Sequence, residues 1–177
     1  MSYFLNEHQK MMRDVAAKFA RTEIMPIANE IDLTETTPEW VTKRCGKLGF
    51  LGVFIPEEYG GVGADLTTAC LILEEIAKAS PAFAGVLSVE MILCPETVRI
   101  LGNEEQKKRL LPLSASGERV MAYSQTEPSG AANVAFHQTR LSSDGNAYRL
   151  NGHKLFCTQG HAKTYLVMCR TEQGGAE

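Results

Sequence analysis

The chain has 177 residues, enough for one large domain or two small ones. Hydrophobic residues make up 44% of it and charged residues 22%, which is ordinary for a globular protein. The net charge of −3 gives no electrostatic reason to expect nucleic-acid binding, which usually needs a basic face, and no run approaches the roughly 20 apolar residues of a membrane span.

The cysteines are odd in number and widely spaced, and none forms a C-x-x-C pair. This argues against a disulfide framework and against a zinc site. Most of them sit in apolar stretches, so we expect four of the five to be buried, reduced thiols, as in the cytoplasm. The residues concerned are Cys45, Cys70, Cys94, Cys157 and Cys169.

The first two-thirds of the chain shows apolar residues at helical spacing. We expect helices over residues 7–24, 38–48, 66–79, 82–101 and 104–111. The residues predicted to cap them are Asn6, Thr37, Asp65 and Asn103. Pro26 should kink or restart the first helix, and Gly49 should end the second in the left-handed conformation. The 82–101 stretch is apolar on most sides, as expected of a helix buried inside a bundle.

After residue 117 the periodicity becomes mostly two, which predicts strands. We expect them over residues 120–125, 137–141, 148–150, 155–158 and 165–169, with a turn at 142–146. Helices followed by strands predict an α+β fold. The expected domains are an N-terminal all-α domain, 1–117, and an antiparallel β domain, 118–177.

Two segments of the β part combine β-prone residues with hydroxyls and a turn. Residues 122–128 read AYSQTEP, and residues 150–160 read LNGHKLFCTQG. Such segments can place backbone amides, a threonine hydroxyl and an aromatic face against one flat polar ring. Taken alone, each segment is more typical of an ordinary strand than of a binding site; together, in this order and at this spacing behind a helical half, they are a much stronger signal.

Five collinear segments, spread over essentially the whole chain, resemble the acyl-CoA dehydrogenase family. They are FARTEIMPIA at 19–28, LGFLGVFIPEEYGG at 48–61, GNEEQKKRLL at 102–111, YSQTEP at 123–128 and LNGHKLFCTQG at 150–160. The resemblance implies a helical domain followed by a β domain that lies against the isoalloxazine ring of FAD.

The resemblance also assigns roles to residues of the β part. Tyr123, Gln125 and Thr126 match the strand whose backbone donates to the pyrimidine side of the ring, with the Thr126 hydroxyl near N5. Phe156 stands where many members carry a tryptophan that packs on the flavin, and Thr158 would add a polar contact. Fixed donors at this edge favour the negative charge that reduction places there.

The implied reaction is α,β-desaturation of an acyl-CoA thioester, with electrons passed to an electron-transfer flavoprotein. Family members are mostly homotetramers and are about twice as long as this chain, with a further helical domain that supplies the catalytic base. We therefore assign no catalytic residue here and expect a homo-oligomer or a complementary C-terminal chain. A non-catalytic subunit of the same fold, or a flavin oxidase or monooxygenase, remains an alternative.

The sequence departs from the family at its substrate edge. The family usually continues Thr-Glu-Pro with Gly-Ala-Gly-Ser-Asp, whereas residues 129–133 read SGAAN. Ala132 cannot make the hydrogen bond of the usual serine to the carrier arm of the thioester. Ala131 adds a methyl group where close backbone approach is common, and Asn133 is neutral. Ala131 and Ala132 are nevertheless the predicted substrate-edge residues.

The remaining polar residues have simpler interpretations. Glu127 is expected to stabilise a turn, and Glu90 to be a paired or pocket-edge carboxylate. His8 should lie on an exposed helix face, and residues 107–109 should form a solvated one. No two histidines have metal-ligand spacing on one helix, so we predict no metal site.

Overall fold

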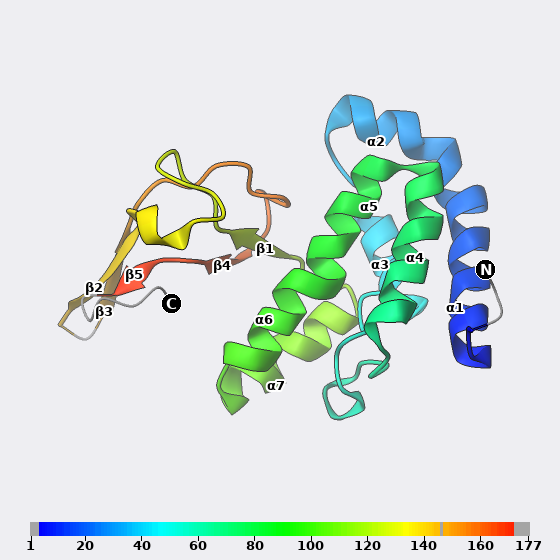
Figure 1. Ribbon diagram of the computed structural model, residues 1–177, viewed down its shortest axis with the longest axis horizontal. Coiled ribbons are helices and arrows are strands. Elements are labelled where there is room, and N and C mark those ends of the chain that lie inside the picture. The colour runs from blue at the N-terminus through cyan, green and yellow to red at the C-terminus, as the bar shows by residue number, and fades with distance from the viewer. Residues whose placement is uncertain (1–3, 146, 172–177) are drawn as a thin grey trace. The chain divides into compact units, whose positions relative to one another are not determined.

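The computed structural model describes residues 4–145 and 147–171. The chain divides into two compact units, Met1–Val120 and Met121–Glu177. The first unit is built of helices and the second holds the strands (Figure 1). The predicted order of helices followed by strands is therefore confirmed.

The helical unit contains α1 to α7, in which short π-helical and 3-10 stretches continue or link several helices (Figure 1). The α-helices are α1 Glu7–Phe19, α2 Ala28–Thr34, α3 Glu39–Lys47, α4 Leu66–Ala79, α5 Pro81–Ser88, α6 Cys94–Leu101 and α7 Glu104–Ala115. The π-helical stretches are Ala20–Ile24 and Val89–Leu93, and the 3-10 turns are Met25–Ile27 and Glu57–Tyr59.

Helix starts follow the predicted caps in three of four cases. Asn6 accepts a hydrogen bond from the Gln9 amide at 2.8 Å and Asn103 accepts one from the Gln106 amide at 2.9 Å, each in a capping box. The Asp65 side chain caps α4 by accepting from the Thr68 amide at 2.8 Å, without a capping box. The predicted Thr37 cap is wrong: Pro38 is the N-cap of α3, and no side chain caps that helix.

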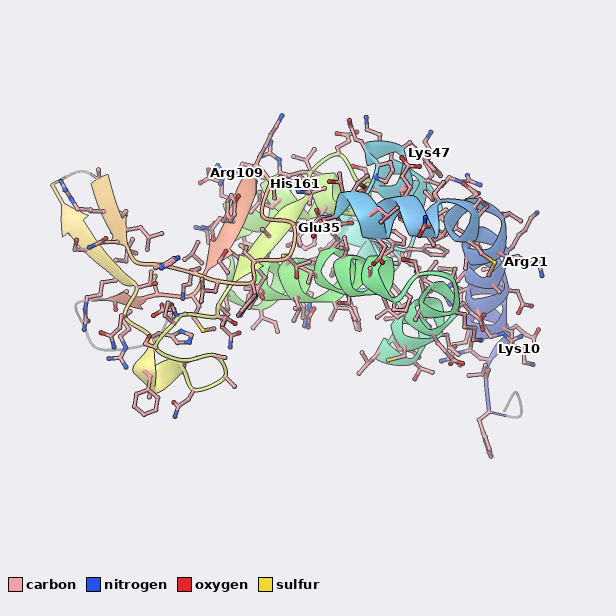
Figure 2. All side chains as sticks on the ribbon, turned by 90° about the horizontal axis from the view of Figure 1, so that it is seen from above. Lys10, Arg21, Glu35, Lys47, Arg109 and His161 are labelled. Carbon is pink, nitrogen blue, oxygen red and sulfur yellow. The ribbon has the colours of Figure 1, made fainter. Side chains whose placement is uncertain are left out.

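The core of the helical unit is centred on α4, which packs against both α1 and α5, and it includes buried residues of α3 and of the loop at 50–53. The Phe19 and Phe50 rings meet edge to face, with centroids 5.9 Å apart. Gly46 lets α3 approach the end of α7 closely, because a Cβ there would overlap the Ser116 carbonyl. Charged side chains such as Arg21 and Arg109 lie exposed on the outer surface (Figure 2).

The predicted 82–101 helix is present as α5, the stretch Val89–Leu93 and α6 in succession, but it is not buried on all sides. Leu93, Ile100 and Leu101 are exposed. The cysteine prediction is also only partly right: Cys45, Cys94 and Cys169 are buried, but Cys157 is half-buried and Cys70 is exposed. Position on a helix, rather than apolar neighbours in sequence, decides the exposure of Cys70.

The second unit holds β1 to β5 and a 3-10 turn, Val134–Phe136. The strands are β1 Met121–Ser124, β2 Arg140–Asp144, β3 Ala147–Asn151, β4 Thr164–Val167 and β5 Arg170–Thr171. β1 pairs with β4 in parallel, β2 with β5 in parallel, and β2 with β3 antiparallel. The expected antiparallel pairing therefore holds for the β2–β3 hairpin, whereas long connections bring the other pairs together in parallel.

The strands around the predicted 142–146 turn differ from prediction. The strand expected at 137–141 begins only at Arg140, because the amides of Gln138 and Thr139 donate to a side chain instead of a neighbouring strand. Residues 142–144 of the predicted turn belong to β2, and Gly145 takes the left-handed conformation that reverses the chain. Asn146, also assigned to that turn, lies outside the described residues.

Candidate functional site

The two segments singled out in the β part lie side by side. Beyond the end of β1, the Leu155 amide donates to the Thr126 carbonyl at 2.9 Å, and the Lys154 ammonium donates to the Gln125 carbonyl at 2.8 Å. The Cys157 thiol lies 2.9 Å from the Ser124 hydroxyl. Residues 154–157 are thus held against residues 124–126.

The strand predicted over residues 155–158 is absent. Among the backbone groups of the described residues, the Leu155 amide alone pairs from this segment to the Thr126 carbonyl, after which Phe156 takes a left-handed φ of 54° and the chain turns. A non-glycine residue in this region costs about 1–2 kcal/mol. The Phe156 side chain is 89% exposed. The strand was predicted from the β-propensity of residues 155–158. That prediction is wrong because a segment paired through one backbone hydrogen bond has no second neighbouring strand to keep it extended.

The predicted cofactor residues differ in how far their polar groups are already engaged. Within the described parts of the chain, neither the amide nor the hydroxyl of half-buried Thr126 makes a hydrogen bond, although its carbonyl does. The side-chain amide of Gln125 donates to the Ala131 carbonyl at 3.3 Å. Tyr123 and Thr158 are half-buried. Thr126 therefore offers two donors to a ligand, whereas the Gln125 side chain is turned to the loop.

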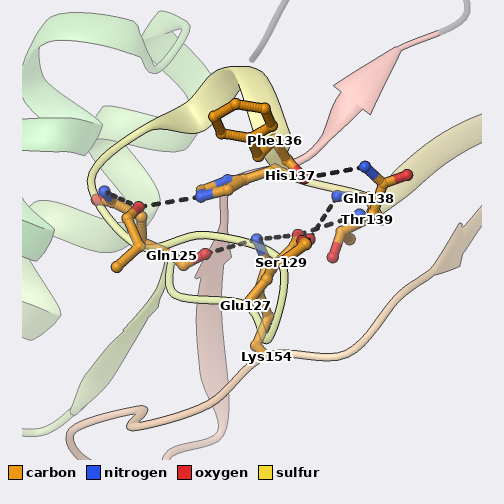
Figure 3. A network of polar contacts seen from close by, with 9 residues as sticks. Gln125, Glu127, Ser129, Phe136, His137, Gln138, Thr139 and Lys154 are labelled. Carbon is orange, nitrogen blue, oxygen red and sulfur yellow. Dashed lines mark hydrogen bonds and ion pairs between the residues drawn. The ribbon is translucent and has the colours of Figure 1, made fainter.

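Glu127 is the centre of a buried polar network in this unit (Figure 3). Its Oε1 accepts from the Thr139 amide at 3.0 Å and from the Lys154 ammonium at 2.8 Å. Its Oε2 accepts from the Ser129 hydroxyl at 3.1 Å and from the Gln138 amide. Glu127 thus joins three stretches of chain, which is more than the single turn expected of it.

Electrostatics keep this carboxylate ionised. Burial acts to raise the pKa of Glu127, but the hydrogen bonds from Gln138, Lys154 and Thr139 outweigh it and hold that pKa well below its ordinary value. The side chains of Glu127 and Lys154 are only 2% and 11% exposed. A carboxylate with these partners is a structural anchor and not a free base.

His137 fixes the loop that follows Glu127. It is buried, and its Nε2 lies 3.1 Å from the Ala131 carbonyl, which can only accept, so the proton sits on Nε2 (Figure 3). Within the described residues its Nδ1 is buried without a hydrogen-bond partner. Neither His137 nor Lys154 has a role that its sequence position predicts, since their partners lie 6 to 29 residues away without periodic spacing.

The helical unit identifies the family directly. Residues 6–118 match the profile described as "Acyl-CoA dehydrogenase, N-terminal domain". The chain belongs to the acyl-CoA dehydrogenase family. The α+β fold expected from the resemblance is that of the family's solved structures.

Individual members of the acyl-CoA dehydrogenase family align over nearly the whole chain. The short-chain-specific acyl-CoA dehydrogenase of Clostridium acetobutylicum is 34% identical over 98% of this chain and 46% of its own. A structure from work on the electron transferring flavoprotein of Acidaminococcus fermentans is 35% identical, with a TM-score of 0.89, over 98% of this chain and 46% of that one. Glutaryl-CoA dehydrogenase from Mycobacterium smegmatis with FADH2 is 29% identical, with a TM-score of 0.90, over 96% and 44%. The chain thus spans about half the length of the curated relatives it matches.

Residues 129–133, which depart from the family pattern, form an exposed loop. Ala131 and Ala132 are exposed, and the carbonyl of Ala132 accepts from the Val134 amide. The Asn133 side chain accepts from the Ala135 amide at 3.1 Å and caps the 3-10 turn. The carboxamide of Asn133 therefore stabilises the local structure of this loop.

Other site types find no support in the described residues. Across residues 4–145 and 147–171, no group of three or more His, Cys, Asp or Glu side chains could hold a metal ion. In the same part of the chain, no helix is both long and apolar enough to cross a bilayer. His8 is exposed, as predicted, and Glu90 is buried in the π-helical stretch Val89–Leu93.

Proposed function

We propose that the protein containing this chain catalyses FAD-dependent α,β-desaturation of an acyl-CoA thioester and passes the electrons to an electron-transfer flavoprotein. The observation that carries the proposal is Thr126. Its amide and hydroxyl are unengaged within the described residues, on a segment held in place by residues 154–157. Membership of the acyl-CoA dehydrogenase family agrees with it.

The residues present fit a flavin ring. The Thr126 amide and hydroxyl are donors of the kind that the polar edge of the ring needs. Phe156 presents an aromatic face, which is 89% exposed, one residue beyond the contact between Leu155 and Thr126. Backbone groups of Tyr123 and Gln125, and the Thr158 hydroxyl, would complete the contacts. When bound, FAD would supply the hydride acceptor of the reaction.

This chain would bind and orient the cofactor and would not supply the base. Glu127 accepts hydrogen bonds from four groups and has a strongly lowered pKa, so it is unsuited to take a proton from a substrate. We assign no catalytic residue to this chain. Ala131 and Ala132, on their exposed loop, would border the carrier arm of the thioester without a side-chain hydrogen bond.

A spectroscopic experiment tests the function. The natural polypeptide that contains this chain is purified with FAD, and acyl-CoA thioesters of several lengths are added without oxygen. Bleaching of the visible flavin band, with formation of the enoyl-CoA, is the expected result. Hydrogen peroxide formed in air would point to an oxidase instead, and a preparation that never retains flavin would refute both.

A non-catalytic subunit of the same fold is the second candidate. The sequence SGAAN at residues 129–133 supports it, since Ala132 and Asn133 lack the usual serine hydroxyl and acidic group. Flavin that binds but is not bleached by any acyl-CoA would favour this candidate. We also propose a cytoplasmic homotetramer, in line with five free cysteines and with the family resemblance; the native mass in solution tests the assembly.

A further inference from the structure

The ammonium of Lys154 is held inside the second unit by two acceptors. Its Nζ lies 2.8 Å from the backbone oxygen of Gln125 and 2.8 Å from Oε1 of Glu127. Both side chains of the ion pair are almost fully buried. Burying two charges costs several kcal/mol per ion, and an apolar pair of similar size is often as stable. Stability of the fold alone therefore does not account for a buried ion pair at this position.

The acceptor on the backbone suggests that role. The Gln125 carbonyl and the Thr126 amide belong to one peptide group. A carbonyl that accepts a charge-assisted hydrogen bond polarises its peptide group, and this makes the N–H of the same group a stronger donor. That N–H makes no hydrogen bond within the described residues.

The same peptide group is also fixed in position. On its far side the Thr126 carbonyl accepts from the Leu155 amide at 2.9 Å. Glu127, the next residue, is anchored by the amides of Gln138 and Thr139. A donor held in this way does not have to reorganise when charge develops in front of it, which is the condition for effective electrostatic stabilisation.

We propose that Lys154 is a positioning residue that, through the peptide group between Gln125 and Thr126, orients and strengthens the Thr126 N–H as a donor to bound flavin. This inference rests on the proposed function. Reduction places negative charge on the pyrimidine side of the ring, so a stronger donor there favours the reduced form and raises the reduction potential.

Reduction potentials of a variant series test the role. The natural polypeptide containing this chain is loaded with FAD and titrated anaerobically against a reference dye. In the double variant Lys154→Met/Glu127→Gln, both charges are removed together, so no unpaired ion stays buried. We expect its preference for reduced over oxidised flavin to fall about tenfold, equivalent to about 30 mV for a two-electron couple.

Three further variants separate positioning from support of the fold. Glu127→Gln keeps the Lys154 contact to the Gln125 carbonyl, so its potential should equal or exceed that of the wild type. Lys154→Arg keeps a charged donor and should stay near the wild type. Lys163→Met removes an exposed lysine of the same unit and should change nothing.

The outcomes are distinguishable. A double variant with the wild-type potential overturns the proposal, and so does an equal fall in Glu127→Gln, which would mean that the ion pair serves only the fold. Wild-type protein that retains no flavin refutes the proposed function itself. Thermal melts and circular dichroism check that each variant folds. If Lys154→Met/Glu127→Gln does not fold, Lys154→Gln/Glu127→Gln replaces it, because its two side-chain amides can hydrogen-bond to each other. The same fall of about 30 mV in reduction potential is expected of this replacement.

Discussion

Phe156 combines a strained backbone with an exposed ring, so its replacement by glycine should separate stability from binding. The left-handed conformation costs a non-glycine residue about 1–2 kcal/mol, whereas glycine costs about 0.5–1 kcal/mol in conformational entropy. Little packing is lost, since the side chain is 89% exposed. Phe156→Gly should therefore leave the cofactor-free protein unchanged or up to about 1.5 kcal/mol more stable.

Phe136→Gly is the matched control. Phe136 is 58% exposed and lies in the 3-10 turn Val134–Phe136, without a left-handed φ. Glycine there relieves no strain and loses partial burial, so we expect a destabilisation of about 1–2 kcal/mol. Urea unfolding of the cofactor-free proteins measures both changes. Equal destabilisation of the two variants would refute the argument from backbone strain.

The same variant tests the binding role of the ring. An aromatic contact contributes about 0.5–1.5 kcal/mol beyond the area it buries, and 1.4 kcal/mol is tenfold in affinity. Phe156→Gly should thus weaken FAD binding by about tenfold while the fold is kept, and Phe136→Gly, corrected for stability, should not. Unchanged affinity for FAD in Phe156→Gly would remove Phe156 from the proposed site.

Three further predictions concern stability. Gly152→Ala should destabilise the second unit by about 2 kcal/mol or more, because the new Cβ would lie 2.6 Å from the Cβ of buried Thr139. Gly85→Ala, in open space on α5, should instead stabilise the protein by about 0.5–1 kcal/mol. Thermal melts compare the two variants. Asn6→Ala should cost about 1 kcal/mol through loss of the α1 cap, measurable by urea unfolding, and an unchanged midpoint would contradict the capping role. The lowered pKa of Glu127 means that its contribution is complete above its ordinary pKa of 4.5 and is lost as the pH falls below it, so the stability difference between wild type and Glu127→Gln should shrink from neutral pH to about pH 3. A difference that stays constant with pH would show that folding does not lower the pKa of this carboxyl group.

The sequence by itself determined the helical unit, because the interactions that start and stop helices are local. Asn6, Asp65 and Asn103 each cap a helix through an amide three residues further on, and such spacing is visible in a single sequence. Three segments that resemble the family, 19–28, 48–61 and 102–111, also lie in this unit, and the family match over residues 6–118 covers them. Thr37 failed as a cap because a shift of one residue at a helix start changes which residue takes that role.

Only the tertiary structure decided the site. Lys154 meets Gln125 across 29 residues and Glu127 across 27, and no pattern in the sequence marks either pairing. Residues 155–158 are β-prone, yet one hydrogen bond and a left-handed Phe156 turn them away from a strand. Strand formation and buried ion pairs depend on which distant segments become neighbours, and that depends on the packing of the whole unit.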